Sequence, residues 1–536
     1  MMSSAIVLAA VSYISQAIAA PSYVAHPERT AAVKEVFQHA WDGYYTYAFP
    51  NDTLRPISES YENDRQVKLL KGTKNGTNAR VRNGWGASAV DALSTALIMG
   101  NQEVIDQILE FIPTINFDLT APGREAVSVF ETTIRYLGGL LSAYDLLTGP
   151  LSEYGQDQEA VKALLDQATH LADILSDSFD TPSGIPRNTL FVTPSGTRPS
   201  DDETNGIATI GTLILEWTRL SDLTGDPKYH ELVQKAEDYL LSPLNPELGE
   251  PFPGLIGTNL NVTDGLFVDS SGGWNGGTDS FYEYLIKMYL YDSEKYKFYL
   301  DRWITAIDSS IEYLTSHPTS RPDITFLAAY RGANDLNFVS THLACFDGGN
   351  FILGGLTLDR KDYIEYGLEL VNGCHETYLA TETQIGPEVF RWQDSKLPPN
   401  ASNNQPPPAD WADFYEDAGF WITGSSYVLR PEVIESYYYA YRATGNTTYQ
   451  DWAWDAFLAI NATTRAGVGY SSVSDVNAPG GGEKTDFQES FFFAEVLKYS
   501  YLVQAEEAPW QVSADHDNRF VYNTEAHPLR AKGDPI

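Results

Sequence analysis

The sequence predicts an all-α protein made of helical hairpins, arranged either as a solenoid or as a closed toroid. Apolar residues recur at three- and four-residue steps along almost the whole chain, which is typical of amphipathic helices. Similar glycine turns end three of these stretches: LTG at 147–149, LTGDPKY at 223–229 and ATGNTTY at 443–449. Repeated helical hairpins without a coiled-coil period indicate these two architectures. A toroid would enclose a central cavity lined by helix ends and loops.

Individual helices follow from the same periodicity. In the last two turns the glycine suits a left-handed C-cap, and the following Asp or Asn can cap the next helix. Alternating patterns typical of strands are few, and the best are 265–270 and 518–525. The segment KLPPNASNNQPPPAD at 396–410 has too much Pro and Asn to form either element, so we expect a surface loop there. Examples of the expected helices are 31–47, 86–99, 125–147, 159–175, 207–223, 228–241, 279–291, 363–379, 432–443, 449–460 and 489–502.

Composition restricts the class of protein. The 536 residues are 43% hydrophobic and 13% aromatic, which is enough for a large core and argues against disorder. A net charge of −37 disfavours nucleic acid as a partner, because phosphate binding requires basic patches. Because helical hairpins continue on both sides of the Pro-rich loop, we expect one domain spanning 20–536.

The N-terminus has the features of a secretory signal. An apolar stretch at 5–18 is too short to span a membrane comfortably, and Ala17-Ile18-Ala19 forms a small-x-small cleavage pattern. We therefore expect a signal peptide at 1–19 and a secreted, lumenal or vesicular protein without a later membrane span. The absence of Lys and Arg before the apolar stretch leaves a retained anchor as the alternative. Six Asn-x-Ser/Thr acceptors agree with this route: Asn51, Asn75, Asn261, Asn400, Asn446 and Asn461.

The chain has two cysteines, Cys345 and Cys374. In an oxidising compartment one disulfide between them is the economical interpretation, and two separate buried thiols are the alternative.

Acidic residues stand repeatedly at the starts of apolar, aromatic helices. Glu131 has Arg135 four residues later, and Asp279 follows a Gly-Gly-Thr turn. Glu388 follows Gly386-Pro387, and Glu432 and Glu435 share one helix face. Each has a structural explanation, as an ion pair or as N-terminal charge that complements the helix dipole. Together, however, they would point several carboxylates into the centre of a toroid.

Several carboxylates in an aromatic cavity favour two kinds of chemistry. Glycoside hydrolysis needs an acid and a base on either side of the scissile bond. A hard cation such as Ca²⁺ takes carboxylate, carbonyl and hydroxyl oxygens. No HExxH, GxSxG, Walker or GxGxxG motif is present, and the nine histidines form no ligand-like cluster, so zinc, triad, NTPase and dinucleotide chemistry are disfavoured.

Seven motifs, in order along the chain, resemble those of class I α-1,2-mannosidases, glycoside hydrolase family 47, and are most similar to the secreted fungal members. They are RNGWGASAVDAL (82–93), FETTIRYLGGLLSAYDL (130–146), DSFYEYLIK (279–287), THLACF (341–346), LRPEVIES (429–436), ESFFFAEVLKY (489–499) and NTEAHPL (523–529). The resemblance implies an (α/α)7 barrel with a small C-terminal β-hairpin plugging one end. It also implies calcium-dependent, inverting hydrolysis of terminal α-1,2-linked mannose from high-mannose oligosaccharides and glycoproteins. We expect a monomer.

The resemblance also assigns roles to residues. Glu131 matches the proposed acid, acting through a water, while Asp279 and Glu432 are alternatives for activating the nucleophilic water. Glu388 is assigned to the catalytic set. Thr524 would give its hydroxyl and carbonyl oxygens to calcium, with Glu435, Glu495 and Glu525 holding the waters of the ion. Positions assigned to substrate binding are Arg135, Gly277, His342, Arg430, Glu435, Glu489, Phe491 and Glu495, and Cys345 and Cys374 match the structural disulfide of the family.

One departure concerns specificity. Two residues before the catalytic Asp, endoplasmic-reticulum members carry an arginine that restricts which branch is trimmed, whereas this chain has Gly277. We therefore expect a roomier pocket and trimming toward a five-mannose product. Two rival interpretations remain: a non-catalytic mannose-binding relative, and an unrelated (α/α) barrel glycosidase of the glucoamylase type, which needs no calcium.

Overall fold

The computed structural model describes residues 21–63, 83–123, 125–399 and 401–536. The expected signal peptide at 1–19 and the acceptors Asn75 and Asn400 lie outside these residues. Among the helices described, none combines the length and the apolar content that crossing a membrane requires.

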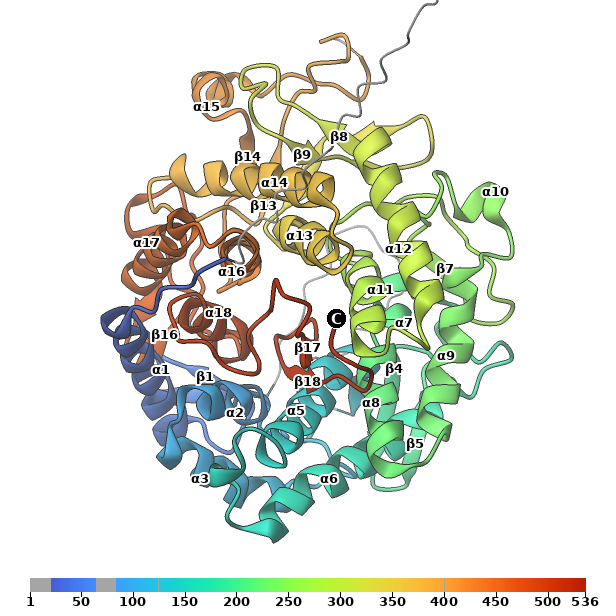
Figure 1. Cartoon of the computed structure of the whole chain (residues 1–536), viewed down its shortest axis with the longest axis vertical. Coiled ribbons are helices and arrows are strands. Elements are labelled where there is room, and N and C mark those ends of the chain that lie inside the picture. The colour runs from blue at the N-terminus through green and yellow to red at the C-terminus, as the bar shows by residue number, and fades with distance from the viewer. Residues whose placement is uncertain (1–20, 64–82, 124, 400) are drawn as a thin grey trace, which may run out of the picture.

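Inner helices form a closed ring (Figure 1). Each contacts the next, and the last contacts the first, so the ring closes and a solenoid is excluded. These helices are buried on nearly all sides; every residue of α2, for example, is buried. In the part of the chain that the structure describes, the inner helices are α2 (Ala87–Met99), α5 (Gly138–Leu147), α8 (Ile214–Thr224), α11 (Asp279–Tyr291), α13 (Asp347–Thr357), α16 (Glu432–Thr444) and α18 (Leu497–Leu502).

A second ring of amphipathic helices covers the first. Each outer helix packs mainly against one inner helix, and α1 pairs with α18, so an early and a late helix of the chain complete the double ring (Figure 1). The seven pairs confirm the expected (α/α)7 barrel. The outer helices, in ring order, are α3 (Gln102–Phe111), α6 (Gln158–Ser176), α9 (Lys228–Leu241), α12 (Lys297–Ser309), α14 (Lys361–Leu379), α17 (Thr447–Thr464) and α1 (Pro27–Tyr47).

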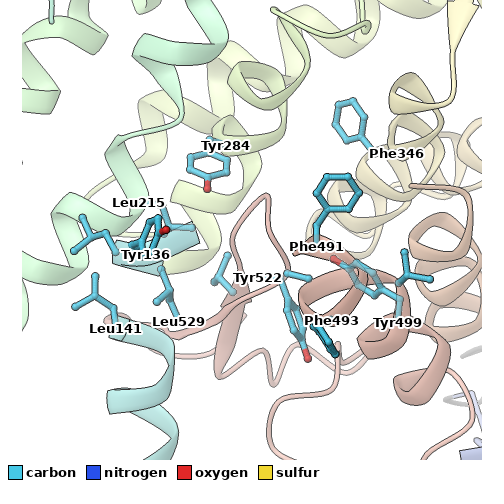
Figure 2. Packing of buried hydrophobic residues seen from close by; sticks show 14 of the residues in the cluster. Tyr136, Leu141, Leu215, Tyr284, Phe346, Phe491, Phe493, Tyr499, Tyr522 and Leu529 are labelled. Carbon is cyan, nitrogen blue, oxygen red and sulfur yellow. The ribbon is translucent and has the colours of Figure 1, made fainter. Parts of the chain in front are cut away.

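A C-terminal hairpin of β17 (Phe520–Tyr522) and β18 (Pro528–Arg530) lies within the ring in Figure 1. Strand β17 contacts α11, and β18 contacts α5. Figure 2 shows its buried side chains among those of the inner helices, with Leu529 close to Leu141. The ring of Tyr522 lies 6.2 Å from that of Tyr499, centroid to centroid. That the hairpin closes one end of the barrel stays a prediction.

Short strands and helices connect the main helices. A sheet of β12 (Val339–Thr341), β13 (Val389–Arg391) and β14 (Trp421–Gly424) packs with α15 (Ala412–Ala418) around a second, smaller core. The described residues of the Pro-rich segment, 396–399 and 401–410, lie beside this core without strand or α-helix, as expected. The other short elements are β1 (Thr53–Arg55), β2 (Ser60–Glu62), β3 (Ala126–Ser128), α4 (Val129–Thr132), β4 (Thr189–Thr193), β5 (Gly196–Pro199), β6 (Thr204–Gly206), α7 (Ile207–Gly211), α10 (Pro246–Gly249), β7 (Asn259–Asn261), β8 (Thr315–Ser316), β9 (Phe326–Leu327), β10 (Ala329–Tyr330), β11 (Leu336–Asn337), β15 (Arg465–Ala466) and β16 (Gly469–Tyr470).

The expected disulfide is present. Cys345, in the 3₁₀ turn η6 (Leu343–Phe346) that precedes α13, is bonded to Cys374 of α14. The bond therefore links an inner helix to its outer partner, and the alternative of two separate thiols is wrong.

Three expectations about individual elements need correction. The strand expected at 265–270 is wrong: the segment makes only an isolated bridge, between Phe267 and Leu260 of β7. On its other edge the Asn245 side chain bonds both the N–H and the C=O of Phe267. The helix expected at 125–147 begins with strand β3 and contains a π-helical segment, η2 (Thr133–Leu137). The helix expected at 207–223 is divided into α7 and α8.

Candidate active site

One cavity of about 700 Å³ opens inside the barrel. Its apolar wall includes Phe130, Ile134, Leu343, Phe346 and Phe491. Among the described residues that line it, eight are acidic and two are arginines, so the site has a large excess of carboxylates. These charged residues are Glu131, Asp279, Glu283, Glu432, Glu435, Glu489, Glu495, Glu525, Arg135 and Arg430.

Most of the residues assigned from the sequence line this cavity, and they come from segments spread over the chain. Gly277 and Thr524 line it together with the charged residues. His342 and Glu388 are not among the lining residues. His342 lies behind Glu432, and Glu388 lies behind Arg430. Their assigned roles in binding and catalysis stay predictions.

Glu131 is placed by α4 and the π-helical segment after it. The hydroxyl of Ser128, at the N-cap of α4, accepts a hydrogen bond from the Glu131 N–H. One Glu131 oxygen accepts hydrogen bonds from Arg135 at 3.1 Å and 2.9 Å. The Glu131 side chain is 22% exposed, so it can reach the cavity while its partner is buried. π-Helical turns occur frequently at functional sites, and a second one, η9 (Phe492–Val496), carries Glu495.

Arg135 connects several walls of the site. It also pairs with Glu525 from the hairpin turn and lies 3.7 Å from Asp91 of α2. Its guanidinium lies over the ring of Phe491, 5.4 Å from the ring centroid. Burial alone would lower the pKa of Arg135, but Glu131, Asp91 and Glu495 outweigh it and raise the pKa. Arg135 therefore stays charged and holds Glu131 in one orientation.

Asp279 and Glu432 have opposite electrostatic environments. Burial raises the pKa of Asp279 to about 7, with Glu283 and Glu432 adding repulsion. Burial alone would also raise the pKa of Glu432, but His342 and Arg430 outweigh it and lower the pKa. His342 Nδ1 lies 2.7 Å from a Glu432 oxygen. Glu432 is therefore the more readily ionised of the two carboxyl groups.

The segment before α16 sets the position of Glu432. Leu429, fully buried, has a φ of 63°, which is a strained backbone conformation for a non-glycine residue. Such strain is often found at functional sites. Arg430 Nε donates to Glu388 at 2.7 Å, and Arg430 NH1 lies 4.0 Å from Glu432. In this arrangement Glu388 acts on the cavity through Arg430.

Two further carboxyl groups, Glu435 and Glu495, line the same cavity as Thr524. Burial, followed by repulsion from Glu283, raises the pKa of Glu435 to about 8. Burial, together with the charges of Glu432 and Glu435, raises the pKa of Glu495 well above its usual value. Crowded carboxylates of this kind repel one another, and a cation among them would relieve the repulsion.

The donor set fits a hard cation. Within the described residues, the Thr524 hydroxyl and carbonyl oxygens accept no hydrogen bond, although the Thr524 N–H donates to Tyr284. Thr524 lines the cavity, so both of its oxygens remain available to a ligand bound there. Across that same part of the chain, no three His, Cys, Asp or Glu side chains converge to hold an ion directly. Oxygen ligands from Thr524, completed by water, match the preferences of Ca²⁺.

Sequence reasoning missed the residues that support the site from behind. Asn523 hydrogen-bonds Glu216, Lys287 pairs with Glu283, and His527 lies 3.3 Å from Asp91. Asn523 and His527 belong to the motif NTEAHPL, so their position beside Thr524 was the available signal. Asp91 likewise belongs to the motif RNGWGASAVDAL, whereas Glu216 gave no signal, because it appears in the sequence as one acid within an apolar helix.

The described glycosylation acceptors lie at the surface. Asn446 is exposed at the N-cap of α17, and Asn51, Asn261 and Asn461 are partly exposed. Their glycosylation stays a prediction.

Known proteins resemble this chain over nearly its whole length. The family model described as glycosyl hydrolase family 47 matches residues 36–531. A mannosyl-oligosaccharide α-1,2-mannosidase of Penicillium citrinum is 55% identical over 499 residues, covering 93% of this chain and 91% of the relative. The enzyme of that name from Coccidioides posadasii is 53% identical over 504 residues, covering 94% and 91%.

A solved structure agrees with these relatives. The α-1,2-mannosidase from Trichoderma reesei superposes with a TM-score of 0.89 at 49% identity, covering 95% of this chain and all of that one. Sequence motifs, the barrel and the acidic cavity lead to the same conclusion. This chain is a member of glycosyl hydrolase family 47.

Proposed function

We propose that this protein is a mannosyl-oligosaccharide α-1,2-mannosidase that removes terminal α-1,2-linked mannose with inversion. The observation that carries the proposal is the distribution of carboxylates around one cavity. Glu131 comes from the segment before α5, whereas Asp279 and Glu432 begin α11 and α16, which are not neighbours of α5 in the ring. An inverting glycosidase needs its acid and base on different walls, because the nucleophilic water must fit between base and sugar. The relatives from P. citrinum and C. posadasii carry this activity in their names.

In the reaction, Glu131 protonates the glycosidic oxygen, through a water, as the bond from that oxygen to the anomeric carbon breaks. Glu432 takes a proton from a second water, whose oxygen attacks the anomeric carbon from the opposite face. What supports Glu432 over Asp279 as the base is its stabilised carboxylate, paired with His342 and Arg430. Arg135 holds the acid in place. The products are mannose with the inverted anomeric configuration and an oligosaccharide shorter by one residue.

Calcium belongs to the proposal as well. Thr524 would hold the ion through its hydroxyl and carbonyl oxygens, with Glu435, Glu495 and Glu525 orienting the surrounding waters. When bound, the ion supplies a hard positive charge that attracts the oxygens of a sugar. The excess of carboxylates in the cavity supports this assignment.

We also propose that several α-1,2-linked mannoses are removed, toward a five-mannose product. Gly277 lines the cavity with a φ of 96°, and a β-carbon built there would approach only Thr258, at 3.9 Å. Nothing therefore narrows the entrance at this point. High-mannose glycans on glycoproteins of the secretory pathway are the proposed substrates, and residues 20–536 are the proposed catalytic domain.

Digestion of a nine-mannose glycan in calcium-containing buffer tests this function. We expect successive loss of mannose until five remain. No release at saturating calcium would favour the mannose-binding relative, and unchanged activity in excess EDTA would favour the calcium-independent glycosidase. Arrest after one mannose would refute the proposed product only.

A further inference from the structure

The turn that presents Thr524 is organised by its neighbour Asn523. The Asn523 side-chain oxygen accepts hydrogen bonds from the Glu525 N–H at 3.0 Å and the His527 N–H at 2.8 Å. Within this turn Ala526 has a φ of 56°, in the left-handed region that non-glycine residues seldom adopt. A strained turn persists only where its surroundings determine it, and Asn523, fully buried, supplies that restraint from inside the loop.

The nitrogen of the same amide binds two other elements. It donates to the Ile134 carbonyl at 2.9 Å and to Glu216 of α8 at 2.8 Å. Ile134 belongs to the π-helical segment, in which the Gly138 N–H bonds the carbonyls of Thr133 and Arg135. The Ile134 carbonyl between them bonds Asn523 instead. One side chain therefore joins the Thr524 turn to the segment that carries Arg135, the partner of Glu131.

Two neighbouring residues, Gly138 and Tyr284, accommodate the Asn523 amide. A β-carbon built on Gly138 would lie 2.5 Å from the Asn523 nitrogen, so only glycine leaves room for the amide. The hydroxyl of Tyr284 accepts the Thr524 N–H at 3.1 Å and donates to Glu216 at 2.7 Å. Figure 2 shows that hydroxyl pointing toward the C-terminal hairpin. Asn523, Tyr284 and Glu216 therefore form one buried network beneath Thr524.

We propose that Asn523 is a positioning residue that fixes the two Thr524 oxygens relative to the Glu131–Arg135 pair, and that its amide thereby sets the affinity for calcium. The inference rests on the proposed calcium site at Thr524. It goes beyond that site because Asn523 is fully buried and is not among the residues that line the cavity. Removal of a buried amide leaves its partners unsatisfied, so the strained turn would relax and its two oxygens would no longer converge.

Calorimetric titration of calcium into EDTA-treated protein tests the proposal without using activity. Asn523→Ala is expected to weaken calcium binding by about 10–100-fold, the usual effect of losing a residue that orients metal ligands. The matched control is Asn404→Ala. Asn404 is also fully buried and bonds Asp394, Leu397 and Pro398, but it lies beside the smaller core outside the ring. We expect the control to lower the melting temperature and leave calcium affinity unchanged.

Two milder variants keep the test decisive if Asn523→Ala fails to fold. Gly138→Ala displaces the amide, and Tyr284→Phe removes only the hydroxyl that accepts the Thr524 N–H; both should weaken calcium binding. A double variant that reverses the direction of the hydrogen bond between positions 523 and 216 gives a rescue. Asn523→Asp should weaken calcium binding, and adding Glu216→Gln should restore part of the affinity, because the glutamine can donate to the aspartate.

Wild-type affinity in the folded variants, or an equal loss in Asn404→Ala, would overturn the positioning role. Absence of calcium binding by the wild-type protein would instead overturn the calcium site itself.

Discussion

Replacement of Glu432 by glutamine tests which carboxylate activates the nucleophilic water. Glutamine keeps the size of the side chain and an oxygen that can face His342, which lies 2.7 Å from the carboxylate. It removes the negative charge that accepts a proton, and a general base contributes about 10²–10⁴ to the rate. We therefore expect kcat to fall by this factor, equivalent to about 3–5 kcal/mol of transition-state stabilisation.

At acidic pH, Asp279 is not expected to act as the base in place of Glu432. Burial is the largest cause of the raised pKa of Asp279, and it persists in the Glu432→Gln variant although the repulsion from Glu432 is lost, so Asp279 stays mostly protonated in acid. At pH 8 most of it is ionised. The residual rate of Glu432→Gln should therefore rise with pH, while the wild-type protein keeps its activity in acid because the pKa of Glu432 is lowered.

The assay is release of mannose from an α-1,2-linked mannobiose in saturating calcium, at pH 5.5 and pH 8, with Asp279→Asn measured in parallel. Thermal unfolding checks that each variant is folded. Azide, a small anion that can attack the anomeric carbon without a base, should partly restore Glu432→Gln. Activity of Glu432→Gln within tenfold of wild type, or azide rescue confined to Asp279→Asn, would refute the reasoning.

Three further predictions concern other parts of the chain. Replacing both cysteines, Cys345→Ala with Cys374→Ala, frees a loop of 29 residues and should lower the free energy of unfolding by about 3.6 kcal/mol on the chain-entropy model. A loss below about 1 kcal/mol in denaturant unfolding would contradict this. Asp347 is buried and its pKa is raised to about 8, so between about pH 4 and pH 8 the folded state binds more protons than the unfolded state and loses stability as pH rises. Asp347→Asn should remove up to about 6 kcal/mol of that loss. An unchanged pH dependence of the melting temperature would exclude this. Gly277→Arg should slow trimming of a nine-mannose glycan after the first mannose, and a wild-type product profile by mass spectrometry would refute a specificity role for Gly277.

Periodic apolar patterns predict the barrel well because in each helix pair the outer helix buries one apolar face against the inner helix. They are weakest at α13, whose sequence DGGNFILGGLT has four glycines and is buried on all sides, so no polar face alternates with an apolar one. They fail also at 265–270, where the segment makes only an isolated bridge to β7 and the Asn245 side chain takes the hydrogen bonds of the other edge. A contact between residues 22 positions apart leaves no periodic trace.

The site was predictable as far as its motifs extend. Acids at helix starts indicated inward carboxylates, and family resemblance located Thr524. The opposite pKa shifts of Asp279 and Glu432 could not be predicted, because they depend on His342 and Arg430, which approach Glu432 only in the folded chain. The role of Asn523 depends similarly on Gly138 and Glu216, hundreds of residues away.

The most direct test of the account is the configuration of the first mannose released. Proton NMR can follow an α-1,2-linked mannobiose incubated with the protein in saturating calcium, before the free sugar equilibrates in water. The account predicts that β-mannose appears first, because the water attacks opposite the leaving group. Initial formation of α-mannose, or no mannose at all, would contradict it.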